Sequence, residues 1–174
     1  NIFYPPIKTT MEYFMMPSAV LMERAAHATM IEVLRDISKG DKVVVISSVG
    51  NNGGDGLCAG RMLKTKGFDV SLVLLGDIKN ASKVTKLQYD ICKKYDIEIS
   101  DDINLINSAD VLIDAIFGIG LNREITGIYQ EAVLAFNSND HAKKYAIDIP
   151  SGVCADDGHI FGIAIKADKT VTFN

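Results

Sequence analysis

The sequence lacks the features that would place a protein in a membrane or on nucleic acid. No apolar run approaches the roughly 20 residues that a membrane-spanning helix needs, and no secretory signal peptide can be identified. The 18 Lys and Arg residues form no basic cluster and are outnumbered by 22 Asp and Glu, which gives a net charge of −4. This balance argues against a general nucleic-acid surface. We therefore expect a soluble protein with neither nucleic acid nor membrane as a partner.

Cysteine is scarce and scattered. Cys58, Cys92 and Cys154 form no CxxC pair, and the sequence shows no evident His/Cys metal motif. An odd, scattered set fits a reducing compartment better than a disulfide framework, so we expect a cytoplasmic location. Cys58 and Cys92 are expected to be small buried hydrophobic residues, and Cys154 to be more exposed, without a catalytic role.

Three familiar catalytic or nucleotide-binding motifs are also missing. Without GxGxxG, and without an acidic residue placed to bind a ribose, an ordinary Rossmann dehydrogenase is disfavoured. The glycine-rich loop lacks the Lys and Ser/Thr of a P-loop. Ser151 lies in no GxSxG motif and has no nearby histidine as a base, so a nucleophilic serine is disfavoured. His27, His141 and His159 are interpreted as structural or solvent-facing.

Hydrophobic patterning predicts a regular alternation of strands and helices. Hydrophobic residues make up 48% of the 174 residues, enough for one sizeable core. The expected strands lie at 42–48, 70–75, 97–99, 111–116, 145–149, 162–165 and 170–173. The expected helices lie at about 18–39, 55–66, 82–95 and 129–136. This order predicts a three-layer α/β fold of the doubly wound Rossmann-like type, with a mainly parallel sheet and helices on both faces.

The ends of the sequence suggest a piece of a longer chain. The first residue is not Met, and the last predicted strand stops abruptly. We expect a single domain over residues 1–174 that is truncated at its C-terminus. The Met-rich start (Met11, Met15 and Met16) is expected to pack on the first helix or, alternatively, on a partner chain in a homodimer.

Polar, glycine-rich loops follow three of the predicted strands, at 50–56, 114–120 and 148–152. Ligands of doubly wound sheets bind beyond the carboxyl ends of the strands. The first loop leads into a helix N-terminus, which favours anions such as a pyrophosphate. Its alternative interpretation is a tight Asn-Gly turn in which Asp55 caps the helix.

Oxygen-bearing side chains from these loops suggest a cation site. Asp114 interrupts an apolar strand, and a buried carboxylate is costly unless it is paired or bound to a cation. The alternative is that Asp114 accepts hydrogen bonds from nearby backbone N–H groups. Asn52, Asp114 and Ser151 supply amide, carboxylate and hydroxyl oxygens, which suit a hard cation rather than zinc or copper.

Together the three loops resemble the YjeF N-terminal domain family, the NAD(P)H-hydrate epimerases. The matching stretches are AVLMERA at 19–25, GNNGGDGL at 50–57, DVLIDAIFGIGLNREITG at 110–127 and AIDIPSG at 146–152. One departure is Val49, which stands where the family often has Pro. Members of the family interconvert the R and S forms of the hydrated cofactors NADHX and NADPHX, so that a dehydratase that accepts one epimer can restore NAD(P)H.

The resemblance implies roles for individual residues. Asn52, Asp114 and Ser151 match potassium ligands, and Asp148 matches a substrate-binding acid that we take as the acid/base group. The implied substrate-binding positions are Asn51, Asn52, Gly53, Gly54, Asp55, Gly118, Ile119, Gly120, Leu121, Asn122, Arg123, Glu124 and Asp148. The implied partners are the dinucleotide substrate and an ADP- or ATP-dependent NAD(P)HX dehydratase, fused or separate.

Two functional alternatives remain open at this stage. Relatives of the same fold act as protein-interaction modules, so a non-catalytic nucleotide-binding scaffold is the second hypothesis. Retention of Asn52, Asp114, Asp148 and Ser151 favours catalysis. The hydrated ring can epimerise either by acid-assisted loss and return of its hydroxyl or by transient ring opening, and each route needs a proton donor and acceptor near the ring.

Overall fold

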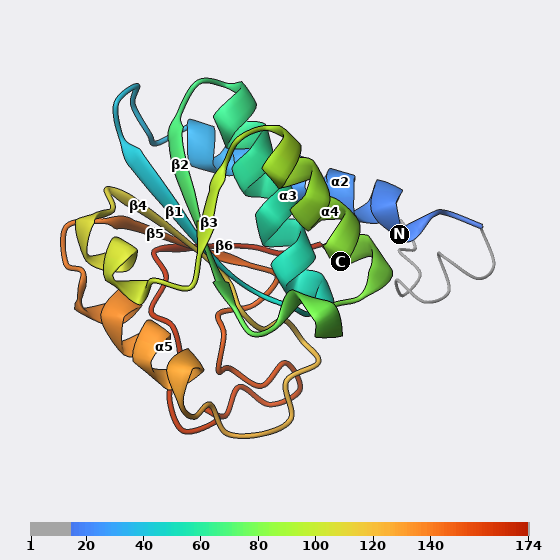
Figure 1. Ribbon diagram of the computed structural model, residues 1–174. Helices are drawn as coiled ribbons and strands as arrows, with labels where there is room; N and C mark the ends of the chain where they lie inside the picture. The colour runs from blue at the N-terminus through green and yellow to red at the C-terminus, as the bar shows by residue number, and fades with distance from the viewer. Residues whose placement is uncertain (1–14, 174) are drawn as a thin grey trace, which may run out of the picture.

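A single parallel sheet organises the chain. The computed structural model describes residues 15–173, and its six strands lie in the order β3-β2-β1-β4-β5-β6 with every neighbouring pair parallel (Figure 1). The strands are β1 (Lys42–Ser48), β2 (Asp69–Leu75), β3 (Glu98–Ser100), β4 (Val111–Ala115), β5 (Lys143–Ile147) and β6 (Lys169–Val171). The predicted α/β class and parallel sheet are confirmed.

Helices cover both faces of the sheet, as the apolar strands require. The helices are α2 (Ser18–Leu34), α3 (Asn51–Thr65), α4 (Lys83–Lys94) and α5 (Ile128–Ser138), with short 3-10 turns η1 (Ile78–Asn80) and η2 (Ile103–Ser108). Residues of α2, α3 and α4 form one buried cluster with the sheet, and residues of η2 and α5 form a second cluster on the opposite face. Figure 1 shows α2, α3 and α4 together on one side of the sheet and α5 on the other. No helix in the described part of the chain is long and apolar enough to span a membrane.

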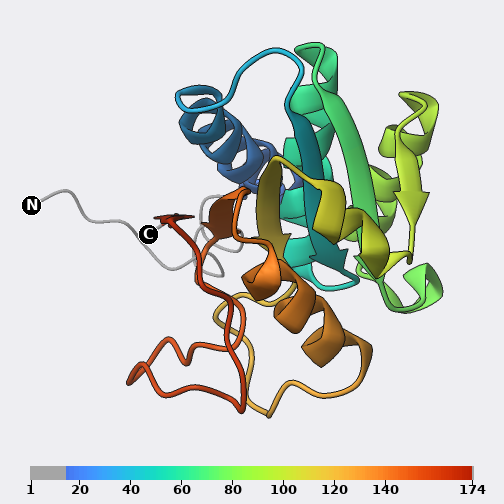
Figure 2. The same cartoon turned by 90° about the vertical axis from the view of Figure 1, so that its left-hand side faces the viewer.

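The sheet reverses its direction of growth between β1 and β4. From β1 the chain adds β2 and β3 on one side, and then β4, β5 and β6 on the other. The crevice beyond the carboxyl ends of β1 and β4 is therefore the switch point where doubly wound sheets bind ligands. The loops after β4 and β5 lie side by side at this end (Figures 1 and 2), and Ile125 N–H donates to Phe161 O across them.

The first helix is shorter than its sequence pattern predicts. It ends at Leu34 rather than near Lys39. The turn that follows is fixed by contacts with the far edge of the sheet, where the Tyr145 hydroxyl donates to the Asp36 carboxylate at 2.7 Å and Lys169 pairs with the same group. This tertiary anchor at Asp36 overrides the helical periodicity that continues to Ile37.

The second helix begins earlier than predicted, and one predicted strand, at 162–165, does not form. Helix α3 starts at Asn51, not Asp55, so most of the predicted glycine-rich loop is the first helical turn. Residues 162–165 are not a strand, which corrects another prediction. In this segment Ile163 N–H donates to Phe161 O and Ile165 N–H donates to Ser151 O, so its backbone bonds to neighbouring loops instead of the sheet.

Candidate functional site

A cavity of about 900 Å³ opens at the switch point of the sheet. Its wall includes most of the residues predicted from the three loops: Asn51, Asn52, Asp55, Gly118, Ile119, Gly120, Leu121, Asn122, Arg123 and Asp148. Gly53, Gly54 and Glu124 are absent from this wall, and Asp114 and Ser151 are buried outside it. The structure thus gathers the three sequence motifs around one hollow.

The N-terminus of α3 reaches the cavity without a side-chain cap. Its N-cap residue is Gly50, and no side chain accepts from the first turn, so the alternative that Asp55 caps this helix is wrong. Because the first N–H groups of a helix have no intrahelical partners, they are available to a ligand. Thr85 of α4 donates to Gly50 O at 3.0 Å and fixes this corner.

Gly53 and Gly54, which are absent from the cavity wall, let α3 approach β1, α2 and α4 closely. A Cβ at Gly53 would lie 1.7 Å from Ser48 O, and a Cβ at Gly54 would lie 2.4 Å from the Met22 side chain and 2.8 Å from Thr85 Oγ1. Glycine at these positions is therefore explained by packing. Their contact with a substrate, like that of Glu124, stays a prediction.

Asn52, Gly118 and Asp148 converge from three separate segments. A Cβ on Gly118 would lie 2.7 Å from Asp148 Oδ2 and 3.4 Å from Asn52 Cγ. Gly118 therefore passes between the two side chains, and glycine is needed there because any larger residue would displace them. This closeness supports the prediction that the first, second and third loops form one site.

Asp148 is held in a constrained position at the end of β5. Its backbone has φ of 70°, which is unfavourable for a residue other than glycine. Its N–H donates to Val171 O at 2.8 Å, and its Oδ2 accepts the N–H of Ile119 at 3.2 Å. The strained backbone thus turns a carboxylate out of the sheet and into the cavity.

Asp55 is the second carboxyl group of the cavity. Burial, and then the charge of Asp148, raise the pKa of Asp55 to about 7. A carboxyl group with this pKa holds its proton for much of the time near neutral pH. Two acids with different environments in one cavity are the arrangement expected for acid/base chemistry.

Asp114 ties the second loop to the third. Its Oδ1 accepts from Ile116 N–H at 3.1 Å and from the Ser151 hydroxyl at 2.6 Å, and its Oδ2 accepts from Ser151 N–H at 2.8 Å. Ser151 Oγ in turn accepts from Phe117 N–H at 2.8 Å. The alternative of backbone hydrogen bonds at Asp114 is therefore present in the structure. Burial still dominates, and it raises the pKa of Asp114 to about 6.

The carboxamide of Asn52 is the polar group in this region that lacks a partner. Its Oδ1 and Nδ2 atoms are buried, and neither has a hydrogen-bond partner among the described residues. A buried amide without partners costs about 1–3 kcal/mol, so Asn52 is poised to bind something else. Asp114 and Ser151 are in direct contact, and Asn52 lies close to Gly118, which follows Phe117 in the loop after β4.

The cavity also includes residues that the loop motifs did not point to. Some come from the N-terminal part of α2 and the start of α4, and others lie apart in the sequence: Ser18, Leu21, Met22, Ala25, Ser82, Lys83, Val84, Tyr129 and Phe173. Lys83 and Arg123 bring positive charge to a wall that also carries two acids. The helix that begins near residue 82 was predicted from the sequence, but its position beside α3 depends on the sheet order.

Comparisons with known proteins identify the family of the chain. Residues 18–174 match the family described as YjeF-related protein N-terminus. A protein named NAD(P)H-hydrate epimerase from Levilactobacillus brevis is 48% identical over 156 residues, which are 90% of this chain and 72% of that protein. Proteins of the same name from Limosilactobacillus fermentum and Oenococcus oeni are 42% and 40% identical, over 91% of this chain and 76% and 75% of their own lengths.

A solved structure supports the fold independently. The crystal structure of the yeast protein ynu0 superposes with a TM-score of 0.84 at 22% sequence identity, and the match covers 95% of this chain and 74% of that one. At this identity the structural similarity shows the fold alone, whereas the bacterial relatives show the family.

Proposed function

Because the chain belongs to the YjeF-related N-terminal family, we infer that it is an NAD(P)H-hydrate epimerase, an isomerase that interconverts the R and S forms of NADHX and NADPHX. The observation that carries this conclusion is the 48% identity to a protein of that name over 90% of the chain. The cavity that collects Asn52, Asp55 and Asp148 at the switch point of the sheet supports this inference.

We propose that Asp148 and Asp55 share the proton transfers. The hydrated ring carries its hydroxyl on a carbon bonded to nitrogen, so protonation of that hydroxyl lets it leave as water with the help of the nitrogen electron pair. Water then returns to the opposite face and gives up a proton. Asp55, with a pKa of about 7, is suited to hold the proton that is donated, because efficient acids have pKa values near the working pH.

In this scheme Asp148 is the charged partner of Asp55 and accepts the proton that the returning water gives up. Its carboxylate is fixed by the Ile119 N–H and faces the same hollow as Asp55. The same pair also serves the alternative route through ring opening, which needs a proton on the ring nitrogen and its later removal. We therefore assign the two carboxyl groups without choosing between the routes.

The rest of the cavity is the proposed binding site of the dinucleotide. We propose that the uncapped first turn of α3 at Asn51 and Asn52 receives the pyrophosphate, since helix N-termini bind anions. Lys83 and Arg123 are placed on the wall to add positive charge. The exposed loop at 118–123 then covers the nicotinamide end beside Asp148.

We propose potassium as the bound cation, with Asn52, Asp114 and Ser151 as side-chain ligands. The unpartnered carboxamide of Asn52 and the buried carboxylate of Asp114 fit this role. Asp114 Oδ2 accepts a single hydrogen bond and so retains a free lone pair. Bound there, potassium supplies positive charge that offsets the buried carboxylate and orders the loops around Asn52.

The remaining functional context is also proposed. In cofactor repair the epimerase feeds an ADP- or ATP-dependent NAD(P)HX dehydratase, either fused or separate, and a homodimer is a further expectation. A reducing cytoplasmic location is supported by the three free cysteines, of which Cys58 and Cys92 are buried as predicted. Met15, one of the residues considered for a dimer contact, is 84% exposed, and Met11 lies outside the described residues.

The direct test follows the ratio of R-NADHX to S-NADHX after one epimer is enriched. The wild-type chain should speed equilibration, and Asp148→Asn should slow it by about 10²–10⁴-fold, the usual contribution of a general acid or base. Exposed Asp156→Asn is the matched control and should leave the rate unchanged. Equilibration by the wild-type protein at the uncatalysed rate would instead support a nucleotide-binding scaffold.

A further inference from the structure

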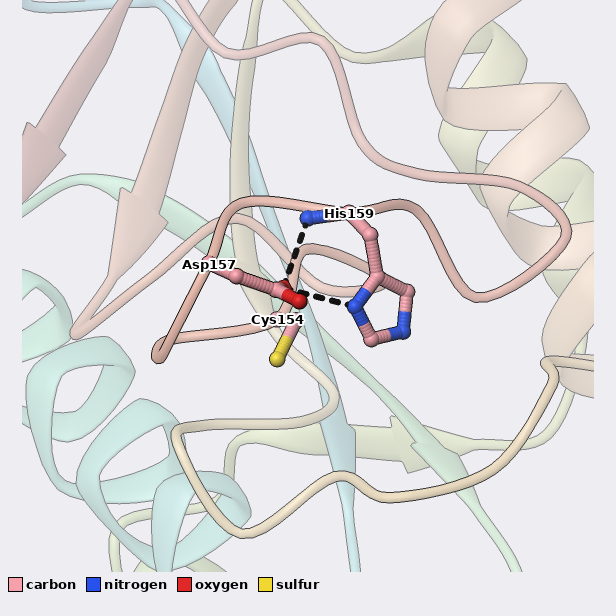
Figure 3. Close-up of side chains that lie close together, drawn as sticks. All are labelled: Cys154, Asp157 and His159. Carbon is pink, nitrogen blue, oxygen red and sulfur yellow. Dashed lines mark hydrogen bonds and ion pairs between the residues drawn. The ribbon is translucent and has the colours of Figure 1, made fainter.

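Three side chains of metal-binding type meet outside the catalytic cavity. Figure 3 shows Cys154, Asp157 and His159 on one loop, with the carboxylate of Asp157 between the thiol and the imidazole. One possible ligand atom from each residue lies within 4.8 Å of the other two, and His159 Nδ1 is 2.6 Å from Asp157 Oδ1. The fold thus brings together in space three possible ligands that form no evident metal motif in the sequence.

The backbone holds this loop in shape before any ligand arrives. Val153 and Ile160 form an antiparallel bridge, so residues 153–160 make a hairpin. Across it, Cys154 N–H donates to His159 O at 2.8 Å, and Gly158 N–H donates to Cys154 O at 3.0 Å. Gly158 has φ of +77°, a conformation that favours glycine. The two ends of the cluster, Cys154 and His159, are therefore fixed opposite each other.

The side chains are also oriented and accessible. The His159 ring packs edge-on against Phe161, with 4.3 Å between ring centroids. The side chains of His159 and Asp157 are 51% and 65% exposed, so an ion can reach them from solvent. None of the three ligands belongs to the cavity wall. The cluster is thus outside the proposed substrate cavity, and it shares no residue with the proposed potassium ligands.

The chemistry of the three donors selects the kind of ion. Thiolate sulfur, imidazole nitrogen and carboxylate oxygen are together the ligands of zinc, whereas potassium and magnesium prefer oxygen alone. Zinc bond lengths of about 2.0–2.3 Å imply ligand atoms about 3.5 Å apart in a tetrahedron. His159 Nδ1 and Asp157 Oδ1 lie 2.6 Å apart, closer than this spacing, and all three ligand atoms already lie within 4.8 Å of one another.

We propose that the 153–160 hairpin binds one zinc ion through Cys154, Asp157 and His159, with water in the fourth position. On binding, the proton of the Cys154 thiol and any proton on His159 Nδ1 are released, and the Asp157–His159 hydrogen bond gives way to two metal bonds. The proposal does not depend on the epimerase assignment, because it uses different residues and a different class of ion.

The test uses Co²⁺ as a spectroscopic probe of the zinc site. The full chain is treated with chelator and reductant, exchanged into potassium-containing buffer and titrated with Co²⁺. A thiolate-to-cobalt charge-transfer band with tetrahedral visible absorption should appear at one equivalent, and Zn²⁺ should abolish it. Cys154→Ser should remove the charge-transfer band, and both Cys154→Ser and His159→Gln should weaken Co²⁺ binding by more than about tenfold.

Two controls separate this site from other metal-binding groups. Asp156→Asn changes an exposed acid of the same hairpin without removing a ligand and should bind Co²⁺ as the wild type does. Cys58 and Cys92 are fully buried and stay in every variant. Any charge-transfer band that they cause would therefore remain in Cys154→Ser. A charge-transfer band that persists in Cys154→Ser, or wild-type protein without such a band, would overturn the proposal.

Discussion

The Ser151 hydroxyl donates a 2.6 Å hydrogen bond to the fully buried carboxylate of Asp114. Ser151 follows β5 and Asp114 lies within β4, so this bond joins the ends of two neighbouring strands. Because the same hydroxyl accepts from Phe117 N–H, it also fixes the start of the loop that lines the cavity. The integrity of the site therefore depends on a side chain that lies outside the cavity wall.

Ser151→Ala should lower both stability and activity. The substitution leaves part of a buried carboxylate and the Phe117 N–H without a partner, which costs about 1–3 kcal/mol. Urea unfolding measures the loss in the free energy of unfolding. Ser138→Ala, at an exposed position of α5, is the control and should change the free energy of unfolding little. Equal stability of the two variants would show that the hydrogen bonds of Ser151 do not stabilise the fold.

Gly53→Ala should destabilise the protein much more than Gly120→Ala. A Cβ at Gly53 would overlap the backbone of Ser48, whereas at Gly120 nothing lies within 4 Å. Overpacking against backbone costs about 1–3 kcal/mol or more, and the loop substitution should stay within about 1 kcal/mol of the wild type. Thermal unfolding of the two variants compares them directly, and similar midpoints would contradict the close approach of α3 to β1.

The sequence predicted the sheet and the location of the candidate site at the ends of its strands. Prediction from sequence was wrong where tertiary contacts decide the local structure. Apolar strands such as 42–48 need cover on both faces, so the parallel sheet followed from hydrophobic patterning and the order of strands and helices. The helical start at Asn51 could not be predicted because Asn and Gly favour turns. Its stability comes from packing of Gly53 and Gly54 against β1 and α2, which no local pattern reveals.

The role of Asp55 was hidden for a related reason. Its position after two glycines favours a helix cap, and only the structure shows a carboxyl group buried beside Asp148. Lys83 likewise lies far from the glycine-rich loops in sequence and reaches the cavity because α4 packs beside α3. The three-residue hairpin cluster was missed because Cys154 and His159 are brought opposite each other by a turn at Gly158.

Lys83→Ala should weaken substrate binding with little effect on the chemical step. Lys83 lines the cavity at the start of α4, and in the proposed binding mode its charge attracts the pyrophosphate. Loss of an exposed charge contact should raise KM about three- to tenfold, since tenfold corresponds to about 1.4 kcal/mol. Lys94→Ala at the other end of α4 is the matched control. A fall in kcat at constant KM would place Lys83 in the chemistry instead.

Replacing potassium by tetramethylammonium should lower the thermal midpoint of the wild-type chain. An ion that binds only the folded state stabilises it in proportion to the logarithm of its concentration over Kd. Asn52→Ala removes one proposed ligand and should abolish most of this potassium dependence. Asn104→Ala, at an exposed position in η2, should retain it. The same potassium response in the wild type and Asn52→Ala would exclude Asn52 as a ligand.

Asp55→Asn should remove a pH dependence of stability that the wild type shows. Because the pKa of Asp55 is raised from an ordinary 3.8 to about 7 in the folded chain, the folded state binds this proton more tightly than the unfolded state. Its contribution is therefore present at low pH and is lost as pH rises from about 4 to 7, at no more than about 1.4 kcal/mol per pH unit.

The measurement compares free energies of unfolding in urea at pH values between 4 and 8. The difference between wild type and Asp55→Asn should fall steadily across this window and level off above it, because both wild-type states are then ionised. Asp148→Asn removes the neighbouring charge, so in that variant the transition caused by Asp55 should lie at lower pH than in the wild type. A difference that stays constant with pH would show that Asp55 is ionised throughout and would assign proton donation to another group.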